Sequence, residues 1–183
     1  MKTFEKIVQP IIFLLLLIFL VISPIQAENL ISTHFIDVGQ GDSVLIELPN
    51  NKNMLIDAGP NSSGDKVVDY IKKNGIDTIN YLIGTHPHAD HIGGLDDVIE
   101  SFKIGKIYLP QVNHTTKTYE DVLLAIDAKD KKIQAAKKGL MILENKNLKA
   151  EILSPIYDDY QDLNNWSVVV KVDYKDISFL FTG

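Results

Sequence analysis

The sequence predicts an α/β fold of the four-layer αββα type, in which two sheets pack face to face and helices cover the outside. Three observations lead to this prediction. Residues 31–56 read as strands alone, residues 57–136 alternate between helical and strand-like patterns, and residues 141–181 read as strands again. No internal repeat or low-complexity linker interrupts this order, so we expect one domain over residues 28–183.

Short apolar runs between turn residues indicate the first strands. We expect strands over residues 31–38, 43–48 and 54–56, joined by the Gly-rich turn 39–42 and the polar turn 49–53. Because these connections are short, an antiparallel arrangement is favoured.

Capping signals and apolar spacing indicate the helices of the middle part. A capping box of Ser62 and Asp65 opens the first helix, and a box of Thr118 and Asp121 opens the last. Between them, the apolar residues of 94–102 have helical spacing. The later strands are expected at residues 79–84, 106–109, 133–136, 141–143, 148–153, 168–172 and 177–181.

Residues 1–27 read as a targeting segment and not as part of the fold. Two lysines precede an unbroken apolar run over residues 11–22, and the small residue Ala27 follows it. We expect a secretory signal peptide that is cleaved after Ala27, and therefore a secreted bacterial protein. The alternative is an uncleaved anchor that holds the domain outside the membrane, since residues 7–25 approach the roughly 20 apolar residues of a spanning helix.

Composition narrows the class of protein. The chain has 183 residues, a formal net charge of −6 and no cysteine. An acidic balance is not typical of a general nucleic-acid binder, although lysines at 129–132 and 137–138 provide local positive charge. The lack of cysteine fits an exported protein without disulfides, and it excludes thiolate metal ligands and a cysteine nucleophile.

The residues with the strongest chemical signal lie in the segment 85–95, THPHADHIGGL. Residues two apart in an extended segment project to the same side, so His86 and His88 can share one ion. Asp90 and His91 follow one turn later and can face a second ion. Imidazole together with carboxylate suits zinc, manganese or iron rather than calcium. The alternative is a surface histidine cluster that binds no metal.

This segment resembles the signature of the metallo-β-lactamase-fold hydrolases. Three further segments resemble the branch found at the C-terminal end of bacterial competence (DNA-uptake) membrane proteins: residues 35–43 (FIDVGQGDS), 55–59 (LIDAG) and 164–169 (NNWSVV). The resemblance extends from Ser32 to the last residue. It implies an αββα sandwich with the metals at one edge of the two sheets.

The resemblance also implies roles for individual residues. His86 and His88 would hold the first of two divalent metal ions, zinc or manganese, and Asp90 and His91 the second. Asp90 would in addition orient the attacking hydroxide as a catalytic residue. Asp57, which ends a buried strand, is expected to accept the free N–H of a ligand histidine. The alternative for Asp57 is a turn aspartate.

Other residues are candidates for positions near the metals. Asn164 and Asn165 stand where many members of the superfamily place a third histidine, so the site is expected to favour manganese or to bind metal loosely. The alternative is a loop Asn pair. Asp37 and Asp42 flank a Gly turn, where they lie near the metals or satisfy turn amides. Trp166 is either a stacking platform for a base or an anchor of the last hairpin.

The resemblance implies further ligands that residues 1–183 do not contain. In the family, a strand that ends like residues 181–183 is followed by an aspartate that bridges the two metals, and later by another histidine. We therefore expect a domain that is incomplete at its C-terminus and binds metal poorly. A titration that shows two tightly bound ions per chain would contradict this expectation.

These observations together predict an exported metal-dependent hydrolase, a phosphodiesterase or nuclease that acts by metal-activated water. The expected substrate is a phosphodiester, with single-stranded DNA outside the membrane as the leading example. One alternative is a β-lactam or thioester hydrolase, which the Asn pair disfavours. The other is a non-catalytic or decayed binding domain with the same fold.

Overall fold

The computed structural model describes residues 30–183 of the chain. The expected targeting segment, residues 1–27, lies outside the described residues. Between residues 30 and 183, no helix is both long enough and apolar enough to cross a membrane.

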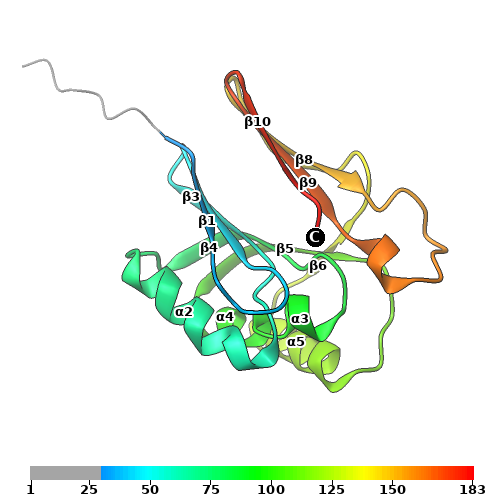
Figure 1. The fold of residues 1–183 in the computed structure, drawn as a ribbon. Helices are drawn as coiled ribbons and strands as arrows, with labels where there is room; N and C mark the ends of the chain where they lie inside the picture. Colours follow the sequence, from blue (N-terminus) through cyan, green and yellow to red (C-terminus); the bar gives the residue numbers. More distant parts are fainter. Residues whose placement is uncertain (1–29) are drawn as a thin grey trace, which may run out of the picture.

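Within the described residues, ten strands form two sheets (Figure 1). The first sheet has the order β1-β2-β3-β4-β5-β6 and the second the order β10-β9-β8-β7. The strands are β1 (Ser32–Phe35), β2 (Val44–Leu48), β3 (Lys52–Ile56), β4 (Thr78–Ile83), β5 (Lys103–Pro110), β6 (Ile133–Ala136), β7 (Met141–Glu144), β8 (Leu148–Ser154), β9 (Val169–Tyr174) and β10 (Ile177–Phe181).

The length of each connection decides the direction of the next strand. Short turns make β1, β2 and β3 antiparallel, as expected, and the second sheet is antiparallel throughout. From β3 to β6 the strands are parallel, because each crossover carries helix. The α-helices are α2 (Gly64–Lys73), α3 (Ala89–Ile92), α4 (Leu95–Ser101) and α5 (Lys117–Ala128), and the 3₁₀ helices are η1 (Asn61–Ser63) and η2 (Leu163–Trp166).

Helices α2 to α5 cover one face of the first sheet, and the other face of that sheet packs on the second sheet (Figure 1). The expected pair of stacked sheets with helices outside is therefore confirmed. Three of the four expected layers are present in the described part of the chain. No helix of residues 30–183 covers the outer face of the second sheet (Figure 1).

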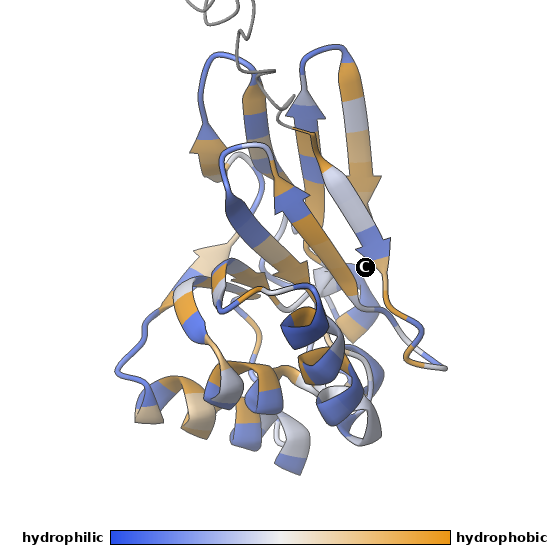
Figure 2. Cartoon of the chain, turned by 90° about the vertical axis from the view of Figure 1, so that its left-hand side faces the viewer, coloured by the Kyte–Doolittle hydropathy of each residue, from blue (hydrophilic) through white to orange (hydrophobic). Residues whose placement is uncertain are grey.

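Successive side chains along each strand of the first sheet point to opposite faces, so the sheet contributes to two separate cores. Figure 2 shows hydrophobic and hydrophilic residues in bands along the strands. In β4, Leu82 points to the helices, whereas its neighbours Tyr81 and Ile83 point to the second sheet. Ile71 of α2 and Ile99 of α4 pack in the helix-side core. The first sheet is therefore buried on both faces.

The helix starts differ from the expected ones by a few residues. Ser62 lies in η1, and Ser63, which precedes α2, makes no side-chain cap hydrogen bond. Thr116, not Thr118, caps α5 by accepting from the N–H of Tyr119. The hydroxyls of Ser63 and Thr118 donate to distant segments instead. Local capping is therefore kept at α5, two residues before the predicted position, whereas at α2 the hydroxyl of Ser63 donates to the carbonyl of Val38.

The carboxyl ends of β3 and β4 meet at one edge of the first sheet, because the two strands are parallel neighbours. Ile56 pairs with Ile83 at these ends, so Asp57 and the histidine segment leave the sheet side by side. The N–H of Val168 donates to the carbonyl of Thr85 at 3.0 Å, which ties the start of β9 to the same edge. Parallel α/β sheets commonly bind ligands at such an edge.

Candidate functional site

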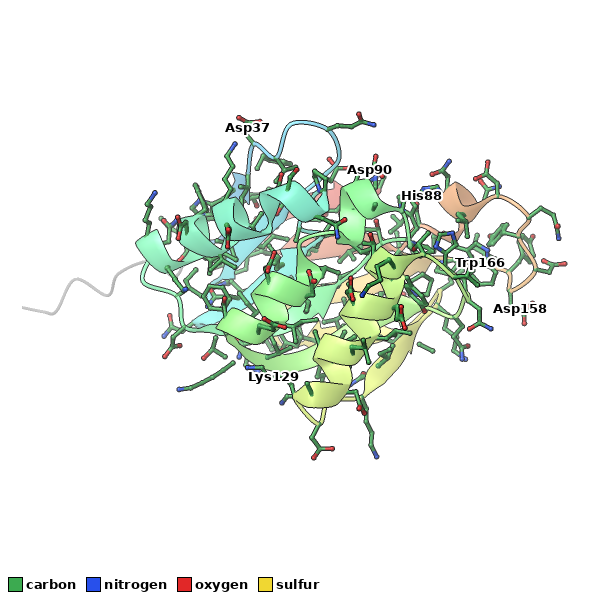
Figure 3. All side chains as sticks on the ribbon, turned by 90° about the horizontal axis from the view of Figure 1, so that it is seen from below. Asp37, His88, Asp90, Lys129, Asp158 and Trp166 are labelled. Carbon is green, nitrogen blue, oxygen red and sulfur yellow. The ribbon has the colours of Figure 1, made fainter. Side chains whose placement is uncertain are left out.

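The histidine segment gathers three imidazole rings at the end of β4. The ring centroids of His86 and His88 are 4.8 Å apart, and those of His86 and His91 are 4.1 Å apart. We call these three residues the histidine cluster. In Figure 3, His88 and Asp90 lie at one edge of the molecule, and Lys129 lies on the opposite side. The structure therefore brings together the histidines that the motif predicted, with Asp90 in the first turn of α3.

A fully buried carboxylate, Asp57, anchors the cluster. Its Oδ1 accepts from the backbone N–H of Thr85 at 2.7 Å. Its Oδ2 accepts from the Thr85 hydroxyl at 2.6 Å and lies 2.9 Å from Nδ1 of His91. Asp57 has a φ of 57°, an uncommon conformation that turns the chain at the end of β3. A carboxylate that orients a metal-binding histidine makes this same contact with the ring N–H. The effect of Asp57 on metal binding stays a prediction.

The hydrogen bonds determine which ring nitrogens carry protons. Thr85 donates its only hydroxyl proton to Asp57, so its oxygen can only accept from Nδ1 of His86, 3.1 Å away. Nδ1 of His91 faces the carboxylate and also carries a proton. In the neutral form of both rings, the lone pair therefore lies on Nε2. The sequence pattern did not reveal this role of Thr85.

His86 is held in its neutral form. Burial is the main cause that lowers the pKa of His86 to about 4, and the positive charges of His91 and His88 lower it further. The carboxylates of Asp90 and Asp162 act in the opposite direction but do not outweigh burial. At neutral pH the ring of His86 is uncharged, which is the form that binds metal ions.

Asp57 and His91 influence each other's pKa through the hydrogen bond between them. Burial raises the pKa of the Asp57 carboxyl, although the hydrogen bonds from His91 and Thr85 act to lower it. Burial acts to lower the pKa of His91, but the hydrogen bond and charge of Asp57, together with Asp90 and Asp42, raise it. Burial of Asp57 and the carboxylates around His91 thus both favour the protonated forms of this pair.

The Gly-rich turn 39–42 forms one wall of the site. Gly41 has a φ of 91°, and a Cβ built on it would lie 1.7 Å from the backbone oxygen of Asp90. Only glycine fits at this position. Oδ2 of Asp42 lies 3.9 Å from Nδ1 of His91, and the Asp42 side chain is 58% exposed. Asp42 therefore lies beside the cluster on its solvent side.

Other expected near-site residues have different surroundings. The Asp37 carboxylate accepts from Nζ of Lys66 at 3.3 Å and from the N–H of Gly39 at 3.2 Å, so it stabilises the turn. Asn164 and Asn165 are exposed in η2, and their backbone N–H groups donate to the capping residue of that turn. These contacts are those of a turn aspartate and of an Asn pair in a loop, and a role near bound metals stays a prediction for all three residues.

The segment after η2 contacts the cluster through Ser167, which the sequence pattern did not single out. Its Oγ lies 3.3 Å from Nδ1 of His86 and provides a second acceptor for that N–H. Trp166 is only 6% exposed, and its Nε1 donates to the carbonyl of Tyr160 at 3.1 Å. Its burial leaves little of the ring face open for stacking, and its hydrogen bond holds it to the loop between β8 and β9.

The donor types of the site fit a divalent cation. His86 and His91 carry lone pairs on Nε2, and His88 and Asp90 are half-buried beside them. Over residues 30–183, no group of three or more His, Cys, Asp or Glu side chains is placed to hold an ion as it stands. Binding of an ion by these four residues therefore stays a prediction.

Two glycines of the same turn provide a matched test of the close contact with Asp90. Gly39 and Gly41 both have positive φ, 84° and 91°, but nothing lies within 4 Å of a Cβ built on Gly39. We expect Gly41→Ala to lower the free energy of unfolding by about 1–3 kcal/mol more than Gly39→Ala, because only the former collides with backbone. Urea unfolding measures both variants. Equal losses would contradict the contact.

The lowered pKa of His86 predicts a pH-dependent stability. In the unfolded chain the ring titrates near 6.5, whereas in the folded chain it stays neutral down to about pH 4. The free energy of unfolding should therefore fall as the pH drops from 6.5 to 4, by on the order of 3 kcal/mol from this residue. His86→Asn keeps an N–H donor without a titrating ring, so it should lose less stability over this range. Parallel pH curves for the two proteins would refute the assignment.

Comparison with known proteins places the chain in a family. A family model described as Metallo-beta-lactamase superfamily matches residues 36–183. ComE operon protein 3 from Bacillus subtilis (strain 168) is 30% identical over 165 residues, which are 81% of this chain and 21% of that protein. Uncharacterized protein MJ0448 from Methanocaldococcus jannaschii is 36% identical over 107 residues, 57% of this chain and 40% of that protein. The chain thus spans well under half of the length of these curated relatives.

Solved structures share the fold at low sequence identity. A metallo-beta-lactamase with a HARLDQ motif from Cronobacter sakazakii superposes with a TM-score of 0.55 at 15% identity, covering 81% of this chain and 60% of that one. CmlA, a diiron beta-hydroxylase from Streptomyces venezuelae, gives 0.51 at 13% identity, covering 82% and 29%. These likenesses confirm the expected fold. With a family model that covers most of its length, the chain belongs to the metallo-beta-lactamase superfamily.

Proposed function

We propose that this chain is a metal-dependent hydrolase that cleaves phosphodiesters by metal-activated water. The observation that carries the proposal is the network around Asp57. The Asp57 carboxylate hydrogen-bonds to His91 directly and to His86 through the Thr85 hydroxyl. This network holds both rings with Nδ1 protonated and leaves Nε2 free to bind a cation. Two histidines that only packed in a core would not need to be held in the same tautomer.

Each residue of the site has a proposed task. His86 and His88 hold one divalent ion, zinc or manganese, and Asp90 and His91 hold the second. Such ions, when bound, lower the pKa of water and stabilise charge on the attacking and leaving oxygens. Asp90 also orients the attacking water. Asp57 keeps the rings in place, so that the lone pairs stay directed at the site.

The proposed substrate class is a phosphodiester, with single-stranded DNA as the leading example. The sequence resemblance to DNA-uptake proteins and the similarity to ComE operon protein 3 support this class. Asn164 and Asn165, at the position of a third histidine in many superfamily members, disfavour a β-lactam substrate. The apolar run at residues 11–22 supports action outside the cytoplasm, with the protein either secreted or anchored.

The test is hydrolysis of bis-p-nitrophenyl phosphate and of a labelled single-stranded DNA by the purified full-length protein with Mn²⁺ or Zn²⁺. Activity should require added metal and should fall to the background rate in His88→Ala and in Asp90→Ala, because each variant removes a metal ligand. His114→Ala is the matched control, since that ring is only half-buried and hydrogen-bonds to Thr116. Hydrolysis that persists in the two ligand variants would exclude the proposed site.

Asp57→Asn separates orientation of the rings from the ligands themselves. The amide oxygen can still accept from the N–H of Thr85, but the NH₂ group would face Nδ1 of His91. His91 must then accept at Nδ1 and carry its proton on Nε2, where it blocks a metal. We expect metal affinity or activity to fall about 10- to 100-fold. Manganese titration followed by EPR measures the affinity, and circular dichroism checks that the variant is folded. Unchanged affinity in a folded variant would disprove the orienting role.

A further inference from the structure

A recess of about 260 Å³ lies beyond Trp166 on the loop between β8 and β9. Its lining includes Gln111, Lys137, Ile156, Tyr157, Asp158 and Trp166, and we call it the aromatic recess. The side chains of Tyr157 and Ile156 are 65% and 53% exposed. A large exposed ring beside an exposed aliphatic side chain is a common feature of binding surfaces.

Hydrogen bonds and ring contacts of Tyr160 hold the loop that carries Tyr157 in place. The hydroxyl oxygen of Tyr160 accepts from the backbone N–H groups of Ile156 and Tyr157, both at 3.3 Å. The carbonyl of Tyr160 accepts from Nε1 of Trp166. The ring of Tyr160 also contacts those of Tyr157 and Trp166 edge to face, with centroids 5.8 and 5.6 Å apart. Tyr157 is therefore presented on an ordered loop, which reduces the entropy lost when a ligand binds.

The wall of the recess continues into the histidine cluster. Trp166 is followed directly by Ser167, whose Oγ lies 3.3 Å from Nδ1 of His86. In Figure 3, His88, Trp166 and Asp158 follow one another along the same side of the molecule. A substrate that reacts at the histidines can therefore extend along this side into the recess.

The charges around the recess discriminate between ligands. Lys137 is exposed in the lining, and the N–H of Lys138 donates to the carbonyl of Pro155 at 2.9 Å, which fastens the lysine segment to the loop. Lys137 can neutralise one phosphate. Asp158 repels a second anion but can accept a hydrogen bond from an amino group, and Gln111 can donate or accept. The lining thus fits an uncharged, flat, hydrogen-bonding ring next to a phosphate.

We propose that the aromatic recess is a subsite for a nucleobase of the substrate, stacked on Tyr157, with the adjoining phosphate at Lys137. This inference rests on the proposed phosphodiesterase function and narrows its substrates to phosphodiesters that carry a base. Stacking on an aromatic ring tolerates any base, because every base has a π-face. The subsite therefore selects nucleic acid over other phosphodiesters without selecting a sequence.

The test compares two fluorescein-labelled strands of equal length and charge by fluorescence anisotropy, with the full chain in EDTA. One strand is a hexamer of deoxyadenosine, and the other has hydrogen in place of every base. We expect the base-bearing strand to bind about 5- to 150-fold more tightly, because this is the gain in affinity that one stacked base contributes. Tyr157→Ala should remove most of this preference and Tyr157→Phe should keep it. Phe35→Ala removes a ring that is 76% exposed on β1 and should leave the preference unchanged.

Equal affinity for the two strands, or no binding of either, would overturn the subsite, as would a preference that survives Tyr157→Ala. Because the measurement is made without metal, it does not depend on hydrolysis. Metal-dependent hydrolysis without a base preference would leave the proposed function standing and remove the subsite. A Tyr157-dependent base preference in a protein that hydrolyses nothing would support the subsite and remove the function.

Discussion

The interaction on which the rest of the site depends is the burial of the Asp57 carboxylate. A carboxylate that is fully removed from water is unstable unless hydrogen-bond donors surround it. Here the donors are the N–H and hydroxyl of Thr85 and Nδ1 of His91, all from the segment that carries the proposed ligands. The same hydrogen bonds that make the buried charge tolerable also orient the rings. A substitution that disturbs Asp57 therefore changes the stability of this edge of the sheet and the orientation of the rings together.

The parallel arrangement of β3 and β4 makes this interaction possible. Their carboxyl ends lie in register, so the residue after one strand faces the segment after the other. The left-handed backbone at Asp57 then directs its carboxylate across to Thr85. An antiparallel pair would place these residues at opposite edges of the sheet. Helix α2, which separates the two strands in the chain, is what allows them to run in the same direction.

The local signals of the sequence predicted most of the fold and the centre of the site. Apolar periodicity indicated the two groups of strands and the helices between them, and His86, His88 and His91 share one short segment, so their proximity follows from spacing. Contacts between distant segments were not predictable in this way. Neither Thr85 nor Ser167 belongs to a recognisable ligand pattern, and their roles depend on how β3, β4 and β9 meet. For the same reason the sequence could not distinguish Asp42, which lies beside His91, from Asp37, which pairs with Lys66.

The contact between Ser167 and His86 joins residues that are 81 positions apart. A contact of such high sequence separation forms only after a long loop has closed, and topologies rich in them fold slowly. The side of the histidine cluster that Ser167 lines therefore depends on two distant segments meeting, so long-range topology and not local structure determines how well that side is closed to water.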